Sequence, residues 1–306
     1  MKYFVFDMDE AIAELYSAFY FITSLQIHKV IQTEYPQWQI AVSDSIKRQL
    51  NTAYKQFVKA VLKEEASYKP LGILRPGVLH VMKLLYQLQK AGKVAHVVIY
   101  SNNDSLLCLE FIRDVIHEHL GTTNLICECA HRSHPLRDEF AILSRPHVLY
   151  EKSWSSLKRV LTEGKCKAPS TLSPEDVYFF DDLIHEDLKH MLGNQYHQVP
   201  PYQFKASYER LADLYDDALL KGNVSILQFA PLVDGVYGSA RFPVLTSFQH
   251  ILSLFKATTV RTATKEEVPP LHDKGITIMK AAIYSLGVRT IKKKTHKRRR
   301  THKNNI

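Results

Sequence analysis

The chain has 306 residues, of which 45% are hydrophobic, enough to bury a core in one large domain with an insertion or in two small domains. It has no run of about eighteen uncharged apolar residues, and its first apolar run is short, so we expect a soluble protein without a membrane span or a secretory signal peptide. The formal net charge is +9, and the four cysteines do not suggest a disulfide framework, which favours the cytoplasm or the nucleus.

A short apolar strand that ends in acids is the first predicted element. Tyr3–Phe6 are apolar, and Asp7-Met8-Asp9-Glu10 follow directly. At the carboxyl end of a strand in an open α/β sheet, side chains point into the ligand-binding crevice, so Asp7 and Asp9 would share one pocket. The two carboxylates would repel each other, and a divalent cation relieves such repulsion. An Asx-type turn after an edge strand is the simpler alternative for this motif alone.

Residues 12–68 are poor in Gly and predict helices. Apolar residues recur at helical spacing, for example at Phe57, Val58 and Val61, and indicate two or three amphipathic helices broken near Tyr35-Pro36. The chain would thus leave the sheet, form a helical unit and return. Such a unit could close over the acidic pocket as a lid, or it could form an extra helical layer on the sheet.

The chain returns through a turn at Arg75-Pro76-Gly77, and a helix is predicted over Val78–Lys90. A second buried strand, His96–Tyr100, ends in Ser101-Asn102-Asn103-Asp104, and a helix over Leu106–His117 follows. The polar turn and the free N–H groups of the helix suit an anion. A simple helix cap is the alternative function of Ser101.

Two further strands end in charged residues. His147–Tyr150 is an apolar run before Lys152, which could bind a phosphoryl oxygen and balance the acids, or could simply be solvated. Val177–Phe180 ends in Asp181-Asp182, which offer hard oxygen ligands to a metal ion. A helix is predicted over Glu186–Leu192.

The remainder of the chain carries no recognisable chemical motif. Its predicted elements are an edge strand near Gln198–Tyr202, a helix from about Ala206 to Leu220, a turn region with a helix near Leu245–Phe255, a polar linker over Thr258–Asp273, and a final helix over Ile276–Leu286.

The whole of the formal net positive charge lies in residues 289–306. This tail holds nine of the 40 Lys and Arg residues and no acid, which leaves 31 basic against 31 acidic residues elsewhere. We expect the tail to be disordered. It could make weak contact with nucleic acid or with an import receptor, or it could only improve solubility.

A cluster of Cys127, Cys129, His131 and His134 raises the question of a zinc site. The spacing within each pair is shorter than structural zinc sites normally show. Alternation of side chains on a strand explains Cys127 and Cys129 more simply.

Four of these motifs together resemble a known superfamily. Asp7-Met8-Asp9, Ser101, Lys152 and Asp181-Asp182, in this order and each after an apolar strand, resemble the four motifs of the haloacid-dehalogenase-like (HAD) phosphohydrolases, over about residues 1–205. The stretch from Tyr150 to Leu157 is similar to the lysine motif of carboxy-terminal-domain phosphatases and NLI-interacting-factor-like proteins.

The evidence for the branch of the superfamily is divided. Glu10 is shared with the first motif of the carboxy-terminal-domain phosphatases, D-L-D-E-T-L, whereas the helical insertion and Asp181-Asp182 favour branches with a cap. Ala11 departs from the Thr or Val that the superfamily commonly has at this position.

The resemblance implies an α/β fold with a Rossmann-like parallel sheet flanked by helices and a helical cap-like insertion after the first strand. Residues 1–12 with 69–205 would form the catalytic core and 13–68 the insertion. Residues 206–288 would form a mostly helical C-terminal extension, and 289–306 the disordered basic tail.

It also implies a mechanism. Asp7 would form an aspartyl-phosphate, and Asp9 would act first as general acid and then as general base. Ser101, Asn102 and Lys152 would bind the phosphoryl oxygens. The ligands of Mg²⁺ would be Asp7, the Asp9 carbonyl and Asp182, with Asp181 as a ligand or a support.

Two functions are therefore expected. The first is a Mg²⁺-dependent phosphohydrolase that acts on a phosphomonoester, either a phosphorylated small molecule or a phosphoprotein. The alternative is a catalytically weak binding protein on the same fold, which uses its basic tail for nucleic-acid or nuclear association.

Overall fold

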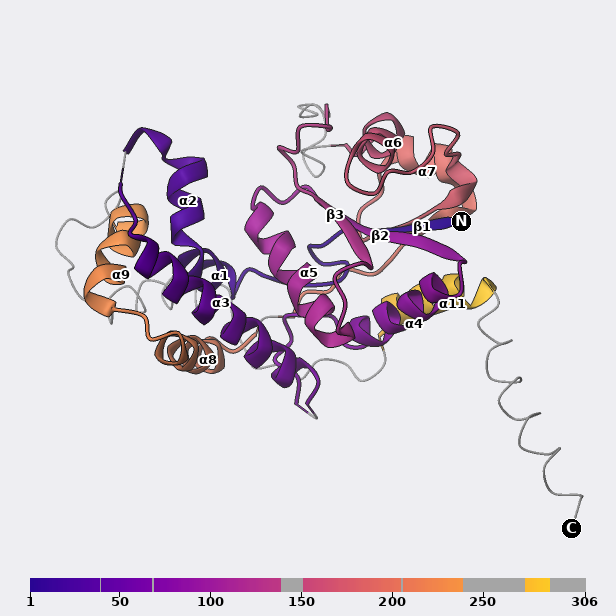
Figure 1. The fold of residues 1–306 in the computed structure, drawn as a ribbon. Helices are drawn as coiled ribbons and strands as arrows, with labels where there is room; N and C mark the ends of the chain where they lie inside the picture. Colours follow the sequence, from indigo (N-terminus) through magenta and orange to yellow (C-terminus); the bar gives the residue numbers. More distant parts are fainter. Residues whose placement is uncertain (39, 68, 139–150, 205, 239–272, 287–306) are drawn as a thin grey trace, which may run out of the picture.

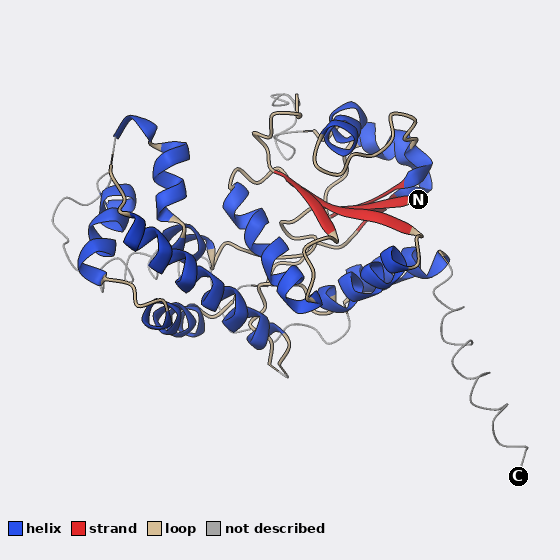
Figure 2. Ribbon diagram, in the orientation of Figure 1, coloured by secondary structure: helices blue, strands red, loops and turns tan. Residues whose placement is uncertain are grey.

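A five-stranded, all-parallel sheet lies at the centre of the computed structural model (Figures 1 and 2). The structure describes residues 1–38, 40–67, 69–138, 151–204, 206–238 and 273–286. The strands are β1 (Lys2–Phe6), β2 (Val94–Tyr100), β3 (Ile126–Ala130), β4 (Val177–Asp181) and β5 (Tyr196–Gln198), in the spatial order β3-β2-β1-β4-β5. The fold is a Rossmann-like α/β fold, which confirms the predicted class.

The order of the strands creates a crevice beside β1. The chain runs outward from β1 to β2 and β3, and then crosses to the other side of β1 to form β4 and β5. Both neighbours of β1 are parallel to it, with Phe6 opposite Ile99 on β2 and Phe180 on β4. In open α/β sheets, ligands bind at the carboxyl ends of the strands where the strand order reverses. Here that point lies between β1 and β4.

Both faces of the sheet are buried, which explains why its strands are apolar without interruption. Phe4 and Phe6 belong to one buried cluster, and Tyr3 and Val5 belong to the cluster on the opposite face. The ring of Phe180 stacks on Phe6 with centroids 4.8 Å apart, so the central strands are joined by aromatic contacts as well as by backbone hydrogen bonds.

Helices cover the two faces of the sheet unequally. One face packs against α4 (Val78–Lys90), α5 (Leu106–Leu120) and α11 (Lys274–Ser285), and the other against α6 (Trp154–Glu163) and α7 (Glu186–Leu192) (Figure 1). The bounds of α4 and α7 match the predicted helices, and α5 begins at the predicted residue. Gly121, with a φ of 62°, ends α5 in the left-handed conformation that glycine adopts readily.

A second, helical unit lies beside the sheet and is built from two distant parts of the sequence (Figure 1). Its members are α1 (Phe19–Leu25), α2 (Ile27–Glu34) and α3 (Asp44–Glu65), which follow β1, and α8 (Tyr208–Lys221) and α9 (Ile226–Val233), which follow the sheet. Together with α5 these helices bury one continuous apolar cluster. The unit is therefore packed against the core through α5.

Contacts inside the helical unit join the two parts of the sequence. The hydroxyls of Ser24 on α1 and Tyr215 on α8 are hydrogen-bonded at 2.8 Å, and the Tyr215 ring lies edge-on to Phe57 on α3. The predicted break near Tyr35-Pro36 is confirmed, because α2 ends at Glu34. The predicted turn region contains a helix, α9, which forms although Pro231 lies within it. Phe229 and Val233 on this helix are buried, and their burial offsets the poor helix propensity of proline.

Arg75 fixes the loop that follows β1. Its guanidinium donates to the carbonyl oxygen of Ala11 at 2.7 Å and to that of Pro200, and its Nε lies 3.2 Å from Asp273 Oδ2 at the start of α11. Only 1% of Arg75 is exposed. A buried guanidinium with several partners orients every segment that it contacts, so Arg75 holds three distant segments in register.

Several predicted elements lie outside the described residues: the strand His147–Tyr150, the helix near Leu245–Phe255, most of the polar linker over Thr258–Asp273, and the tail 289–306. Among the helices that the structure describes, none has the length and hydropathy needed to cross a membrane. Short turns of other helix types occupy Pro36–Trp38, Pro174–Asp176, Gly193–Gln195 and Asp234–Gly238.

The carboxyl group of Glu65, the last residue of α3, should make the free energy of unfolding depend on pH. Its carboxylate accepts from the backbone N–H groups of Ile73 and Leu74, but burial outweighs these bonds and raises its pKa to about 7. The folded state thus binds this proton more tightly than the unfolded chain does. The contribution of Glu65 to the free energy of unfolding therefore falls as the pH rises from about 4.5 through about 7.

We expect Glu65→Gln to increase the free energy of unfolding by on the order of 2 kcal/mol at pH 8 and by much less at pH 5. Urea unfolding at the two pH values measures this difference. Glu163→Gln, at the exposed end of α6, is the matched control. Equal shifts at both pH values for Glu65→Gln would contradict the assignment.

Candidate active site

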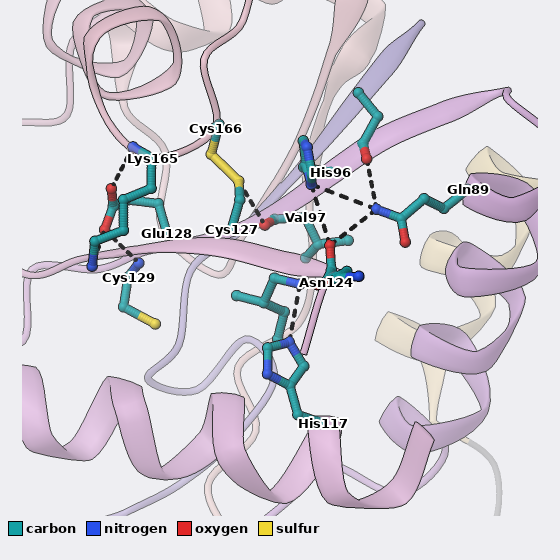
Figure 3. Close-up of a disulfide and its surroundings, with 12 residues drawn as sticks. Gln89, His96, Val97, His117, Asn124, Cys127, Glu128, Cys129, Lys165 and Cys166 are labelled. Carbon is teal, nitrogen blue, oxygen red and sulfur yellow. Dashed lines mark hydrogen bonds and ion pairs between the residues drawn. A yellow bond between two sulfur atoms is a disulfide. The ribbon is translucent and has the colours of Figure 1, made fainter. Parts of the chain in front are cut away.

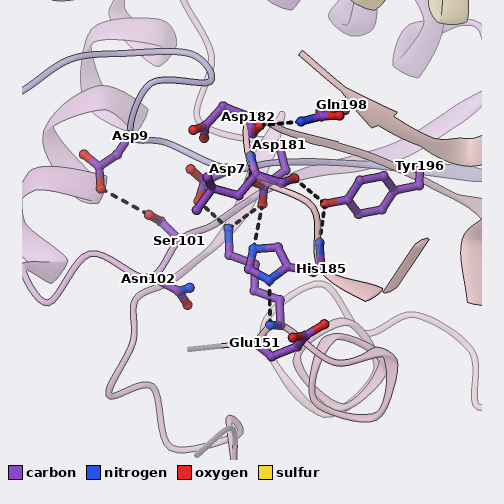
Figure 4. Close-up of polar contacts among 12 residues, drawn as sticks. Asp7, Asp9, Ser101, Asn102, Glu151, Asp181, Asp182, His185, Tyr196 and Gln198 are labelled. Atoms are coloured by element: carbon purple, nitrogen blue, oxygen red, sulfur yellow. Dashed lines mark hydrogen bonds and ion pairs between the residues drawn. The ribbon is translucent and has the colours of Figure 1, made fainter. Parts of the chain in front are cut away.

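The carboxyl ends of β1 and β4 bring two buried aspartates together (Figure 4). Asp7 follows β1 and its backbone N–H donates to the carbonyl oxygen of Phe180 at 2.8 Å, while Asp181 is the last residue of β4. Asp7 is 5% exposed and Asp181 is 1% exposed. Two carboxylates this close and this buried need a positive partner.

Lys152 is that partner. Its Nζ lies 2.5 Å from Asp7 Oδ1 and 2.7 Å from Asp181 Oδ2, and the side chain is almost fully buried. The residue precedes α6, whose N-terminus is capped by the Ser153 hydroxyl accepting from the N–H of Ser156 at 3.3 Å. The cap fixes the backbone next to Lys152, and so helps to aim the ammonium group at the acids.

The charges shift one another's pKa values. Burial raises the pKa of Asp7, although Lys152 opposes this effect. Burial alone would also raise the pKa of Asp181, but the charge of Lys152 and the contact with His185 lower it. The Lys152 ammonium is disfavoured by burial, yet the two carboxylates raise its pKa above the usual value. Lys152 and Asp181 therefore form a stable ion pair. Of the two aspartates, Asp7 is the one whose ionised form is less strongly stabilised.

A histidine and a tyrosine support this cluster. His185 is fully buried, its Nδ1 accepts from the backbone N–H of Lys152 at 3.1 Å, and its Nε2 lies 3.5 Å from Asp181 Oδ2. Since Nδ1 accepts, the proton of the neutral ring is on Nε2 and faces Asp181. Tyr196 accepts from the N–H of His185 and donates to the carbonyl of Leu183 at 2.7 Å (Figure 4).

Asp9 lies beside the cluster and bonds to the turn after β2. Its Oδ2 accepts from Asn103 Nδ2 at 3.0 Å. The same oxygen accepts from the Ser101 hydroxyl at 3.5 Å (Figure 4). Burial raises the pKa of Asp9, although the bonds from Asn103 and Ser101 partly oppose the effect. A carboxyl group with a raised pKa is suited to general acid catalysis.

Asn102, predicted to bind phosphate, lies on the other side of this turn. Its Oδ1 accepts from Arg137 Nη2 at 2.6 Å, and Arg137 also donates to the carbonyl of Ser101 and lies over the ring of Tyr100, 4.2 Å from its centroid. Arg137 thus helps to hold the Ser101-Asn102 turn in place.

Three of the four predicted metal ligands are close enough to share an ion. Oxygen atoms of Asp7, Asp181 and Asp182 lie within 4.8 Å of one another. Burial and the charge of Asp181 raise the pKa of Asp182 to about 7. With all three carboxylates ionised and one ammonium from Lys152, the cluster carries a net charge of −2, which a divalent cation with a preference for oxygen ligands would balance. The residues therefore fit such an ion.

For Asp9 the predicted ligand atom is the backbone carbonyl and not the carboxylate, and this carbonyl accepts from the N–H of Ala11 at 2.7 Å.

A cavity of about 490 Å³ opens next to Asp9, on the side of the helical unit. Its lining comes from the loop after β1, from α1, from the turn after β2 and from the start of α5. The lining residues are Asp9, Glu10, Glu14, Leu15, Tyr16, Phe19, Tyr20, Asn103 and Cys108. Asp9 therefore lies between the buried charge cluster and a space that can hold an organic group.

One cysteine of the possible zinc cluster is bound in a disulfide, so the cluster is not formed (Figure 3). Cys127 is bonded to Cys166, with the two Cα atoms 5.2 Å apart, whereas Cys129 is buried as a free thiol. The two cysteines alternate on β3, as the simpler explanation predicted, and point to opposite faces. Within the described ranges, Asp7, Asp181 and Asp182 form the one group suited to a metal ion. Four cysteines did not suggest a disulfide framework, and the Cys127–Cys166 bond was not predicted. The two residues are 39 positions apart in the sequence, so no local pattern indicated the pair.

Sequence reasoning missed two residues of the site. Asn103 lies in the predicted polar turn, but only the folded turn shows that its amide, and not that of Asn102, reaches Asp9. His185 follows Asp181 by four residues, and this spacing was the available signal for it.

Comparison with known proteins adds nothing, because no family model, curated protein or solved structure matches the chain.

The position of Lys152 predicts a large loss of stability when its charge is removed. Lys152→Met keeps much of the side-chain volume but leaves Asp7 and Asp181 buried without a positive partner. We expect the free energy of unfolding at pH 7 without metal to fall by about 3 kcal/mol, and by less at pH 5, where the aspartates can protonate.

Urea unfolding of Lys152→Met and of a matched control, Lys158→Met on α6, measures this loss. Added Mg²⁺ should restore part of it, because a divalent cation also neutralises the acids. Unchanged stability of Lys152→Met would show that the two aspartates are not held by this charge.

Proposed function

We propose that this protein is a Mg²⁺-dependent phosphohydrolase of the HAD type, which cleaves a phosphomonoester through an aspartyl-phosphate. The observation that carries the proposal is the buried Asp7–Lys152–Asp181 cluster at the end of the central strand, with Asp9 beside it. The four motifs that resemble the HAD phosphohydrolases support the same function, since their residues lie at one edge of the sheet.

Asp7 is the proposed nucleophile. Its carboxylate oxygen forms a bond to phosphorus while the bond from phosphorus to the leaving alkoxide oxygen breaks. Of the two bridged aspartates, Asp7 is the one with the raised pKa, so its charge is the less strongly stabilised and the more basic. Burial from water also keeps competing solvent away from it.

Asp9 is the proposed acid and base. Protonated in the first step, it donates its proton to the leaving oxygen and releases an alcohol. In the second step it accepts a proton from the water that attacks phosphorus, and this attack releases phosphate and regenerates the Asp7 carboxylate. Asn103 and Ser101 orient Asp9 toward this task through the bonds described above.

Lys152 and Ser101 are the proposed phosphoryl-binding groups. The ammonium of Lys152 already contacts the attacking carboxylate, so it is positioned to stabilise negative charge on the transferring phosphoryl oxygens. Asp7 and Asp182 would hold Mg²⁺, with Asp181 as a ligand or a support. When bound, the ion supplies positive charge that neutralises the phosphate next to three acids.

The proposed substrate is a phosphorylated small molecule or a phosphoprotein, and the proposed location is the cytoplasm or the nucleus. In a reducing compartment glutathione acts against the Cys127–Cys166 bond, so the redox state of this pair in cells is a direct check on the location. The alternative of a binding protein depends on residues 289–306, which lie outside the described residues, and no observation favours it.

Hydrolysis of p-nitrophenyl phosphate and of an alkyl phosphate tests the proposal. We expect turnover to require Mg²⁺, to stop with EDTA, and to fall more than about a thousandfold in Asp7→Asn, because an amide is a poor nucleophile. Asp213→Asn, an exposed acid on α8, is the matched control and should keep full activity. Metal-independent turnover, or turnover that survives in Asp7→Asn, would contradict the mechanism.

Asp9→Asn separates the two steps. A nitrophenolate leaves without a proton, so the first step should persist for the aryl ester, whereas the alkyl ester should lose about a hundredfold or more. The second step still needs a base. We therefore expect phosphoprotein to accumulate with the aryl ester, detectable by intact mass and located on Asp7 by peptide analysis. Equal losses for both esters without a covalent intermediate would refute the role of Asp9.

A further inference from the structure

The helix α11 begins against the turn through which the chain returns to the sheet, and it lies beside α4 (Figure 1). Asp273 caps this helix, because its Oδ1 accepts from the N–H of Ile276 at 3.0 Å. The other carboxylate oxygen of Asp273 lies 3.2 Å from Arg75 Nε, and the side chains of both residues are buried. One carboxylate thus holds the start of its own helix and a buried guanidinium.

The fit between α11 and Arg75 depends on a glycine. A Cβ atom at Gly275 would lie 2.5 Å from Nη1 of Arg75 and 2.8 Å from its Cζ, closer than non-bonded atoms approach. The backbone of α11 therefore touches the guanidinium, and glycine is the residue that leaves the space for it. Because the contact is both charged and close, a displacement of α11 would also displace Arg75.

On its other side, Arg75 holds the turn that carries Asp9. This Asp9 turn comprises residues 8–13 of the loop after β1. The Arg75 guanidinium donates to the carbonyl of Ala11 at 2.7 Å, and its backbone N–H donates to that of Ile12 at 2.9 Å. The N–H of Ala11 donates in turn to the carbonyl of Asp9 at 2.7 Å. Successive hydrogen bonds through Ala11 thus connect Arg75 to the backbone of the proposed acid.

The Asp9 turn contains a strained residue that needs this support. Glu10 has a φ of 57°, in the left-handed region that residues with a Cβ atom seldom adopt. Such a conformation persists only where the surrounding structure enforces it. Arg75 supports the turn from one side, and the backbone N–H of Tyr202 donates to the Glu10 carbonyl at 2.7 Å from the other. Loss of the Arg75 contact would therefore let the turn relax.

A small shift of the Asp9 turn is enough to misplace its carboxylate. The bonds to that carboxylate come from Asn103 and Ser101 in the turn after β2, so they lengthen when the two turns move apart. The contact with Ser101 is already 3.5 Å, at the outer limit of a hydrogen bond. Misplacing a catalytic group by about 1 Å lowers a rate by as much as about a hundredfold.

We propose that Arg75 and Asp273 are positioning residues for Asp9, so that α11, a helix distant from β1 in the sequence, is a required part of the active site. This inference rests on the proposed phosphohydrolase function and adds a condition to it: Asp9 transfers its proton efficiently only when α11 is seated on Arg75. The nucleophile is held independently, because Asp7 is fixed by its bond to β4 and by Lys152.

Asp273→Asn tests this role. The amide oxygen can still cap α11, but the amide nitrogen that would then face Arg75 cannot accept from it. We expect kcat/KM for an alkyl phosphate, whose leaving oxygen needs a proton, to fall roughly tenfold. For p-nitrophenyl phosphate, whose leaving group needs no proton, we expect a change of less than about twofold.

Two further variants sharpen the test. Gly275→Ala keeps both charges but places a methyl group where the Arg75 guanidinium lies, so it should cause the same selective loss for the alkyl ester. Lys274→Gln changes one charge in the same turn of α11 at an exposed position and is the matched control. It should leave kcat/KM for both esters unchanged.

Hydrogen exchange measures the coupling without a substrate. The N–H groups of Glu10, Ala11 and Ala13 are hydrogen-bonded within the Asp9 turn. In the full-length Asp273→Asn variant we expect them to exchange severalfold faster than in the wild type, together with the N–H groups of α11. Lys274→Gln should not change the exchange of the turn. Faster exchange confined to α11 would overturn the inference.

The results for the inference and for the function can be told apart. Equal losses for the alkyl and aryl esters in both Asp273→Asn and Gly275→Ala would overturn the inference and leave the phosphohydrolase function intact. Unchanged rates for both esters would do the same. If the wild type hydrolyses neither ester, the proposed function fails, and with it the role in proton transfer, whereas exchange in residues 8–13 still decides whether α11 holds the Asp9 turn.

Discussion

The buried ammonium of Lys152 between Asp7 and Asp181 is the interaction on which the site depends. Neither aspartate can stay ionised in the interior without a positive neighbour, and an isolated buried lysine would itself lose its proton. The three groups are stable only together. Their arrangement requires β1 and β4 to be adjacent and parallel, because only then do two distant segments of the chain deliver carboxylates to the same point.

The surroundings of this cluster divide into two chemically different sides. Toward α6 and α7 lies a rigid support in which His185 and Tyr196 satisfy the backbone and orient Asp181. Toward the helical unit lies a cavity with acidic and aromatic walls, and Asp9 stands at the boundary. The charge cluster on the first side carries the proposed function.

Much of the fold could be predicted because its causes are local. Val78–Lys90 and Glu186–Leu192 show helical periodicity with a glycine near the end, and the apolar runs of β1, β2 and β4 stop at polar residues. The parallel sheet follows from the alternation of strands and helices. The helix α9 was missed because its cause is not local: the burial of Phe229 and Val233 against other helices offsets Pro231.

By itself, the sequence determined the fold class, the chain order of the elements, and the presence of Asp7, Asp181 and Lys152 at or near the ends of elements. These properties follow from periodicity and from the rule that strand ends face the crevice. Only the tertiary structure decided that Asn103 and not Asn102 reaches Asp9, and that Cys127 pairs with Cys166. It also decided that the helices after β1 and the helices after β5 form one unit. Such contacts join residues that are distant in sequence or differ only in side-chain direction, and no local pattern encodes them.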